Sequence, residues 1–260
     1  MSSDRRQRKK EQRARRLEAE RKAAARRELV RRLTTGLGFG LVIAVALIFA
    51  SRSGTSQLPG TYEEFRDRPV ACGAAAPEPY QPMTFDAPEP GQIPTGAEVT
   101  VTLRTSCGPI AIELAVADHP ETSNSFVFLA RQGFYDGTVI HRVVKDFVIQ
   151  AGDPGADGTG GPGYTIADEF PPEDFAFEPG VVAMANSGPG TTGSQFFIVV
   201  GSQADVLPPR FNILGRVVDG FDTIEKILAV PTARQPGTVE ESRPLEAIYI
   251  ESIDVEISGG

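Results

Sequence analysis

The stretch Val139–Asp153 constrains the fold of this 260-residue chain more than any other part of its sequence. It contains two short apolar runs of β type. Arg142 and Gln150 are eight residues apart, so in extended chain they face the same way if no bulge intervenes. A strand, a turn and a second strand would therefore place a cation and an amide beside Phe147. That combination suits the binding of a peptide better than the cleavage of a bond.

The surrounding sequence repeats this β-type pattern. Alternating apolar residues predict a hairpin over residues 99–114 and a last strand at Ile248–Ile257. After residue 96 only two helices are expected, one that starts at Pro120 and stops at Gly133, and one over Phe221–Ala229. Further short strands are predicted at Val181–Ala185, Phe196–Val200 and Ile213–Val218. Many short strands without a regular strand–helix alternation indicate a closed antiparallel barrel.

The charges are divided unevenly along the chain. Residues 1–32 carry fourteen Lys/Arg and five Asp/Glu, a net of +9, and because the whole chain has a net of −8, residues 33–260 carry −17. The acidic body lacks the cationic surface that supplies most nucleic-acid affinity, so no nucleic acid is expected as a partner. For the basic segment 1–32 we expect a solvated helix. We expect it to act as a topology signal that also binds anionic lipid, with nucleic-acid contact as the alternative.

An apolar segment follows the basic one. Leu33–Ala50 runs for eighteen residues without a charge, which is close to the lower limit for spanning a bilayer. We expect a transmembrane helix over residues 33–51, with residues 1–32 in the cytoplasm and the rest outside the cell membrane. A cleaved signal peptide is the alternative, although its basic front would be unusually long and no Ala-x-Ala follows. Either alternative exports the acidic body.

Residues 52–95 are rich in Pro, Gly, Ala and Ser, which indicates a stalk, or an irregular wrap, before a domain at residues 96–260. Cys72 lies in this segment and Cys107 lies in the domain. An exported chain with only two cysteines is expected to pair them. The bridge would stabilise the fold by about 3–4 kcal/mol in the chain-entropy model. Two free thiols remain the alternative.

The familiar catalytic sets fit this sequence poorly. Its only histidines are His119 and His141, with no cysteine or carboxylate cluster that would complete a zinc site. Ser194 lacks the Gly-x-Ser-x-Gly elbow of a serine hydrolase. The glycine-rich loop Gly155–Gly163 lacks the Gly-Lys-Ser/Thr ending of a phosphate-binding loop. No metal and no cofactor are therefore expected.

The remaining motifs lie in order between about residues 98 and 257, and they are Phe134-Tyr135-Asp136-Gly137-Thr138, His141-Arg142-Val143-Val144, Phe147-Val148-Ile149-Gln150-Ala151-Gly152-Asp153, Gly158-Thr159-Gly160-Gly161, Asp168-Glu169-Phe170, Met184-Ala185-Asn186 and Gly193-Ser194-Gln195-Phe196-Phe197-Ile198. In this order they resemble the cyclophilin family of peptidyl-prolyl cis–trans isomerases. The resemblance implies a mainly β fold, a closed antiparallel eight-stranded β-barrel capped by two α-helices. Together with the basic segment and the apolar run, it suggests a membrane-anchored bacterial form.

The resemblance also implies roles for single residues. Arg142 matches the family's catalytic arginine, and His141 matches a residue near the site. A hydrophobic proline pocket and a set of groups that hold the peptide backbone are expected on both sides of Arg142. The residues that match the pocket are Phe147, Val148, Phe197, Leu207 and Phe211, and those that match the backbone-holding groups are Gln150, Ala185, Asn186 and Gln195.

Three positions depart from the best-known members of the family. Val148 stands where methionine is common, Val206 where tryptophan is common, and Phe211 where histidine is common. The change at Val206 implies weaker binding of cyclosporin-type inhibitors. The change at Phe211 removes a polar group but keeps an aromatic wall.

The resemblance implies acceleration of X–Pro rotation in exported, proline-containing polypeptides. A guanidinium aimed at the proline nitrogen stabilises the twisted amide more than either planar form, without a covalent step. The three departures motivate an alternative, a proline-peptide binding module or holdase chaperone with little turnover. A scaffold tethered by the basic segment is a third hypothesis, and it predicts no peptide binding.

Overall fold

The computed structural model describes residues 60–234 and 239–259. The basic segment 1–32 and the predicted transmembrane helix at residues 33–51 lie outside the described residues. Within the described residues, no helix is both long enough and apolar enough to cross a membrane.

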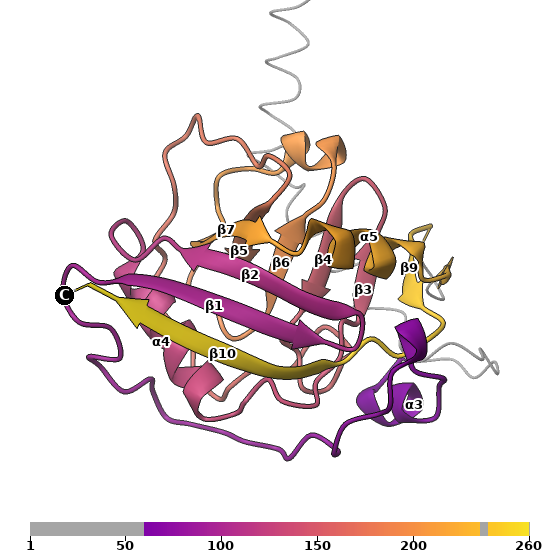
Figure 1. Cartoon of the computed structure of the whole chain (residues 1–260). Helices are drawn as coiled ribbons and strands as arrows, with labels where there is room; N and C mark the ends of the chain where they lie inside the picture. Colours follow the sequence, from indigo (N-terminus) through magenta and orange to yellow (C-terminus); the bar gives the residue numbers. More distant parts are fainter. Residues whose placement is uncertain (1–59, 235–238, 260) are drawn as a thin grey trace, which may run out of the picture. The chain divides into compact units, whose positions relative to one another are not determined.

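An eight-stranded antiparallel sheet forms most of the described part (Figure 1). In chain order its strands are β1 (Glu98–Thr105), β2 (Gly108–Leu114), β3 (Arg142–Val144), β4 (Val148–Ala151), β5 (Val181–Met184), β6 (Phe196–Val199), β7 (Ile213–Asp219) and β10 (Ile250–Ser258). Across the sheet their order is β10-β1-β2-β7-β5-β6-β4-β3. A separate two-stranded sheet pairs β8 (Thr232–Arg234) with β9 (Glu241–Pro244).

The sheet curls into a half-barrel, so the expected closed barrel is wrong, although the number of strands is right. Its two edge strands, β3 and β10, share no ladder. An isolated bridge between Val139 and Tyr249 joins the segment before β3 to the start of β10. Three backbone hydrogen bonds of 2.8 Å accompany it, from Ile140 N to Ile248 O, from Gly137 N to Ile250 O and from Ile250 N to Thr138 O. β3 is only three residues long, and among the described strands of this sheet it pairs with β4 alone.

The two predicted helices are present, and short helical turns accompany them. α4 (Pro120–Arg131) starts with proline in its first turn and buries Phe126 and Leu129, while α5 (Phe221–Ala229) buries Ile224 and Ile227. The remaining turns are α3 (Tyr62–Arg66) and two 3₁₀ segments, Ala71–Gly73 and Ser202–Val206. The buried faces follow the helical period of the apolar residues, which is why the sequence predicts α4 and α5.

Strands β4, β5 and β6 are buried on both faces. Successive side chains of a strand point to opposite faces. Ile149 and Ile198 therefore join the large core that includes α4, whereas Val148 and Phe197 join a second core on the other face. We call this second core the apolar cluster. Its buried members are Val148, Phe177, Val181, Ala183, Phe197, Val199, Ala204 and Ile213, and its half-buried members are Ala115, Phe147, Phe175, Ala185, Leu207 and Phe211.

The segment before β1, residues 60–97, wraps around the sheet, and we call it the wrap. From α3, residues 67–97 run along one side of the domain to the start of β1, in indigo and purple in Figure 1. Backbone hydrogen bonds from Ala71 N to Ala247 O (2.9 Å) and from Phe85 N to Pro162 O (2.8 Å) hold this segment against the domain. Residues 60–95, the described part of the expected stalk, thus follow the domain surface instead of leading away from it, as the wrap alternative predicts.

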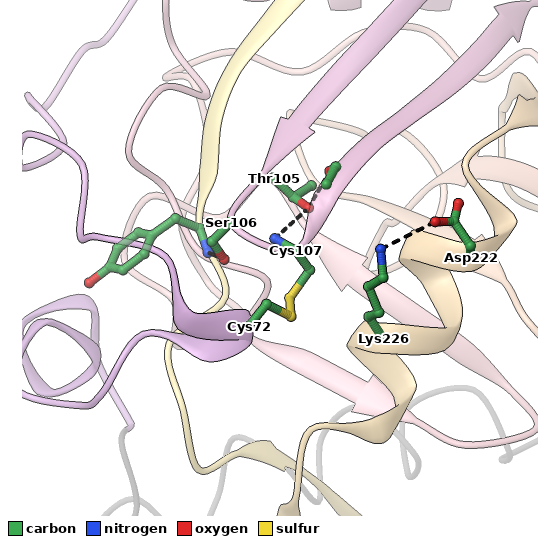
Figure 2. Close-up of a disulfide and its surroundings, with 8 residues drawn as sticks. Cys72, Thr105, Ser106, Cys107, Asp222 and Lys226 are labelled. Atoms are coloured by element: carbon green, nitrogen blue, oxygen red, sulfur yellow. Dashed lines mark hydrogen bonds and ion pairs between the residues drawn. A yellow bond between two sulfur atoms is a disulfide. The ribbon is translucent and has the colours of Figure 1, made fainter.

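A disulfide closes the wrap. Cys72 and Cys107 are joined with their Cα atoms 5.1 Å apart, so the predicted bridge is confirmed. Figure 2 shows it beneath the turn between β1 and β2, where the Cys107 N–H also donates to the Thr105 hydroxyl at 3.2 Å. The wrap is therefore attached covalently to the sheet.

Candidate active site

A row of side chains crosses one face of five neighbouring strands. Arg142 on β3 is paired with Gln150 on β4, and Gln150 is paired with Phe197 on β6. The row continues through Ala183 on β5 to Ile213 on β7. Residues that lie directly opposite each other on adjacent strands project from the same face. The hairpin predicted from Val139–Asp153 thus joins a cation and an amide to the apolar cluster.

The polar end of this row is a chain of directed hydrogen bonds. Arg142 Nη1 donates to Gln150 Oε1 at 3.1 Å, and Gln150 Nε2 donates to Gln195 Oε1 at 3.0 Å. Gln195 Nε2 then donates to the Gly160 carbonyl at 2.9 Å. An arginine can only donate, so the Gln150 oxygen must face it and the Gln150 NH₂ group must point to the next residue. That NH₂ group donates to Gln195, so the Gln195 oxygen faces Gln150 and its own NH₂ group faces Gly160. Both glutamines are therefore held with known donor and acceptor ends.

The guanidinium of Arg142 is also held from outside the main sheet. Its Nε and Nη2 donate to the two carboxylate oxygens of Glu240 at 2.8 and 2.7 Å, and its Cζ lies 5.5 Å from the ring centroid of Phe147. Burial alone would raise the pKa of the Glu240 carboxyl. The hydrogen bonds and the charge of Arg142 outweigh burial and hold that pKa below its ordinary value. The pair is therefore ionised at neutral pH.

Three aromatic rings form the apolar end of the site. Phe211 meets Phe197 edge to face, with centroids 5.4 Å apart, and it meets Phe177 at 6.1 Å. Leu207 packs against the same cluster from the segment that follows the Ser202–Val206 turn, and Val148 is buried in it. Phe211 and Leu207 are half-buried, so the cluster offers apolar surface at its rim. A proline ring could rest there.

The structure brings most of the predicted site residues together on this face. Ala185 is tied to the row because its N–H donates to the Gln195 carbonyl at 2.8 Å. The Asn186 side chain is engaged in its own loop, where Nδ2 donates to the Arg210 carbonyl at 2.9 Å and Oδ1 accepts from Gly188 N at 3.2 Å. Val206 is 82 % exposed, so the position where tryptophan is common in the family adds little enclosure here.

His141 is the exception among the predicted residues. Its side chain is only 3 % exposed, and neither ring nitrogen has a hydrogen-bond partner among the described residues. Burial, followed by the charges of Arg243 and Arg142, lowers its pKa to about 3. His141 is thus a neutral, buried neighbour of the site, and its ring does not face a peptide.

A buried arginine that the sequence does not reveal supports the site from behind. Arg243 on β9 is 4 % exposed, and its Nη1 donates to the carbonyls of His141 (2.9 Å) and Ala156 (2.7 Å). Its Nη2 reaches the Gly60 carbonyl at 3.2 Å, and its Cζ lies over the Phe65 ring at 5.6 Å. Arg243 therefore ties the strand of Arg142 to the wrap.

The glycine-rich loop is shaped by Asp153. Its buried carboxylate accepts from the N–H of Gly155 at 2.8 Å and of Gly158 at 2.5 Å, and burial raises its pKa despite these bonds. Gly152, just before it, has φ of +82°, and a side chain there would collide with the Ser194 carbonyl. Glycine is thus required where β4 ends, and the loop it starts presents the Gly160 carbonyl to Gln195.

Comparison with known proteins identifies the family to which the half-barrel belongs. The family model described as "Cyclophilin type peptidyl-prolyl cis-trans isomerase/CLD" matches residues 100–255. The chain belongs to the cyclophilin family. The match covers all eight strands of the half-barrel except the outer ends of β1 and β10, and it includes every predicted site residue except Cys72.

Two bacterial members of the family illustrate how far the likeness extends. The chain is 39% identical over 182 residues to a Mycobacterium tuberculosis protein named "Probable peptidyl-prolyl cis-trans isomerase B", an alignment that covers 64% of this chain and 58% of that protein. It is 43% identical over 176 residues to "Peptidyl-prolyl cis-trans isomerase B" of Streptomyces anulatus, covering 61% of this chain and 97% of that one. The chain thus spans little more than half the length of the mycobacterial relative.

The fold agrees with a solved cyclophilin. A crystal structure of a cyclophilin-type peptidyl-prolyl cis-trans isomerase from Cryptosporidium parvum superposes with a TM-score of 0.55 and 31% identity. It covers 63% of this chain and 99% of the other. The same Cryptosporidium protein has also been solved in the presence of the dipeptide Ala-Pro.

Proposed function

We propose that this chain is a peptidyl-prolyl cis–trans isomerase in which Arg142 stabilises the twisted X–Pro amide. The observation that carries the proposal is the fixed guanidinium of Arg142 at the edge of the apolar cluster. A guanidinium has five N–H donors. Three of them are bound by Glu240 and Gln150, which leaves two, and these have no partner among the described residues. Those two are available to a peptide.

The chemistry needs only a positioned donor beside an apolar surface. Rotation about an X–Pro bond is slow because the partial double-bond character of the amide must be lost. In the twisted state the proline nitrogen becomes pyramidal and regains a lone pair, which accepts a hydrogen bond that the planar amide cannot. An N–H of Arg142 directed at this nitrogen would bind the transition state more strongly than either planar isomer.

The neighbouring groups account for binding of the substrate. The proline ring would rest on the half-buried rim formed by Phe147, Leu207 and Phe211. The oriented amides of Gln150 and Gln195 would meet the peptide backbone. The Cryptosporidium relative was solved with Ala-Pro, so an Ala-Pro peptide is the first substrate to test.

Arg142→Ala tests the role of the guanidinium. Loss of one preorganised donor typically costs about 10²–10³-fold in rate, so we expect isomerisation of an Ala-Pro peptide to fall by about that factor. NMR exchange spectroscopy on the full-length chain with saturating peptide measures it. Arg104→Ala is the matched control, because Arg104 is also a strand arginine that binds a carboxylate, Asp254. It lies on β1, six places from β3 in the strand order.

The outcomes separate the proposal from its alternative. Full activity in Arg142→Ala would refute the arginine mechanism. If the wild-type chain binds the peptide without faster exchange, the binding module or holdase chaperone takes the place of the isomerase.

We also propose that the domain acts on exported polypeptides while anchored in the membrane by residues 33–51. The uncharged run at these residues supports an anchor, and the Cys72–Cys107 disulfide supports an oxidising compartment outside the cytoplasm. Protease added to spheroplasts should destroy a C-terminal epitope and spare an N-terminal one. A C-terminal epitope that survives until the cells are lysed would contradict this location.

A further inference from the structure

Glu240 contacts Arg142 although 98 residues separate them in the sequence. Glu240 immediately precedes β9, in the two-stranded sheet that lies outside the half-barrel. Its two oxygens face Nε and Nη2 of Arg142, and the two side chains are 35% and 28% exposed. Planar bidentate pairs of this kind fix orientation as well as distance. The partial burial of both side chains reduces the screening that weakens surface ion pairs.

The support under Glu240 is itself fixed to the strand that carries Arg142. Arg243, three residues further along the same hairpin, donates to the carbonyl of His141, the residue just before Arg142. Ser242, on the same hairpin, also helps to hold the pKa of the Glu240 carboxyl below its ordinary value. The carboxylate therefore has a defined position relative to β3, so it can set the position of the guanidinium.

The two bonds to Glu240 determine which N–H groups of the Arg142 guanidinium remain available to a ligand. They occupy the edge formed by Nε and Nη2, and Gln150 takes one hydrogen of Nη1. The two remaining N–H groups are one on Nη1 and one on Nη2. The plane of the guanidinium is held on two sides, so these donors keep a constant direction. Without Glu240, the described residues would restrain the Arg142 side chain only through the single bond to Gln150 and the contact with Phe147.

We propose that Glu240 is a positioning residue for the isomerase reaction, acting through Arg142. The proposal rests on the proposed function. It assigns a role in turnover to the β8–β9 hairpin, which contributes no residue to the row across the sheet. Because the contact is with the arginine and not with the substrate, removal of the carboxylate should lower the rate at saturating peptide and leave peptide affinity nearly unchanged.

Glu240→Gln is the principal variant, because it keeps the size of the side chain and removes the charge and one acceptor. We expect the exchange rate of an Ala-Pro peptide at saturation to fall by about tenfold, as for other small misplacements of a catalytic group. The peptide dissociation constant should change less than about twofold. Glu241→Gln is the matched control, since it is the next carboxylate in the chain and is exposed, and it should behave as wild type.

A second readout does not depend on activity. The Nε–H of Arg142 donates to Glu240, so its NMR resonance in the full-length chain should be protected from exchange with water. Glu240→Gln should remove that protection, while Glu241→Gln should retain it. Circular dichroism of each variant shows whether the fold is intact.

A double-mutant cycle distinguishes positioning from a structural role. In an Arg142→Lys background, which cannot form the planar pair, Glu240→Gln should have little further effect on the exchange rate. Equal fold-losses in both backgrounds would show that Glu240 acts elsewhere, and would overturn the proposal.

Unchanged or increased turnover in Glu240→Gln would also overturn the proposal, and increased turnover would identify Glu240 as a brake. In both cases a wild-type chain that accelerates exchange would leave the proposed isomerase function standing. A wild-type chain that does not accelerate exchange would refute the function, and the positioning role with it.

Discussion

Arg142 on β3 and Arg243 on β9 lie in different sheets that meet at His141, and the fold uses the two arginines in opposite ways. Arg142 is held by side chains, a carboxylate and an amide, and two of its five donors remain available among the described residues. Arg243 is almost completely buried and donates only to backbone carbonyls, those of His141, Ala156 and Gly60. The first is a cation held ready for a ligand, whereas the second cross-links three segments of the chain. Burial and spare donors therefore separate a functional arginine from a structural one.

Arg243→Met should give the largest effect in this comparison. It leaves three carbonyls, two of them buried, without their charged donor, so we expect the free energy of unfolding to fall by about 2–4 kcal/mol. Urea unfolding of the full-length chain measures the loss. Arg216→Met is the control, since Arg216 is exposed and pairs with Glu178 at the surface. Isomerase activity per folded molecule should fall no further than in Glu240→Gln, because Arg243 acts on Arg142 only through the hairpin that carries Glu240.

The opposite result would remove the distinction between the two arginines. If Arg243→Met unfolds at the wild-type urea concentration but loses exchange activity as Arg142→Ala does, then Arg243 belongs to the catalytic machinery and not to the framework.

A smaller effect should come from His141, which lies between the two arginines. Its pKa is about 3 in the folded protein, because burial and the two positive charges oppose protonation, against 6.5 in the unfolded chain. Between these values the unfolded chain binds a proton that the folded protein does not, so stability falls as the pH falls. We expect a loss of about 2 kcal/mol from this residue between pH 7 and pH 5.

His141→Gln removes this titration and keeps a neutral polar side chain. Its stability should therefore depend less on pH in the same window, as urea unfolding at pH 7, 6 and 5 would show. If the stability of the wild-type chain and of the His141→Gln variant depends on pH in the same way, then His141 binds a proton in the folded protein as readily as in the unfolded chain. In that case its ring would not be the neutral, buried neighbour of Arg142 described above.

Local patterns predicted most of the elements because short-range periodicity decides them. Apolar alternation located β1, β2 and β10, and the strands β5, β6 and β7 begin at the predicted residues. The helix α5 has the predicted bounds. The closure of the sheet was not predictable, because it depends on whether β3 and β10, which are far apart in the sequence, pair with each other. Periodicity within a strand does not report which strand lies beside it.

The site likewise contains residues that local spacing predicts and residues that only the tertiary fold brings in. The pairing of Arg142 with Gln150 follows from eight residues of extended chain folded once, so their spacing predicts it. Glu240 and Arg243 reach the site from 98 and 102 residues away, on a hairpin without an apolar alternation. In sequence both look like solvated charges, and only the tertiary fold shows that one is paired and the other buried. Leu207 and Phe211, on the far side of the apolar cluster, were predicted from the resemblance to the cyclophilin family. Their spacing in the sequence alone does not indicate that they belong to the site.

The disulfide also determines how a mechanical load would pass through the domain. A pull on the chain at Gly60 travels along α3 to Cys72 and crosses the sulfur bridge directly to Cys107. Residues 73–106, which include the rest of the wrap and all of β1, form a closed covalent loop outside that path. Tension on the N-terminal side is thus delivered at the turn between β1 and β2, and the wrap cannot be peeled off the domain residue by residue while the bridge is intact.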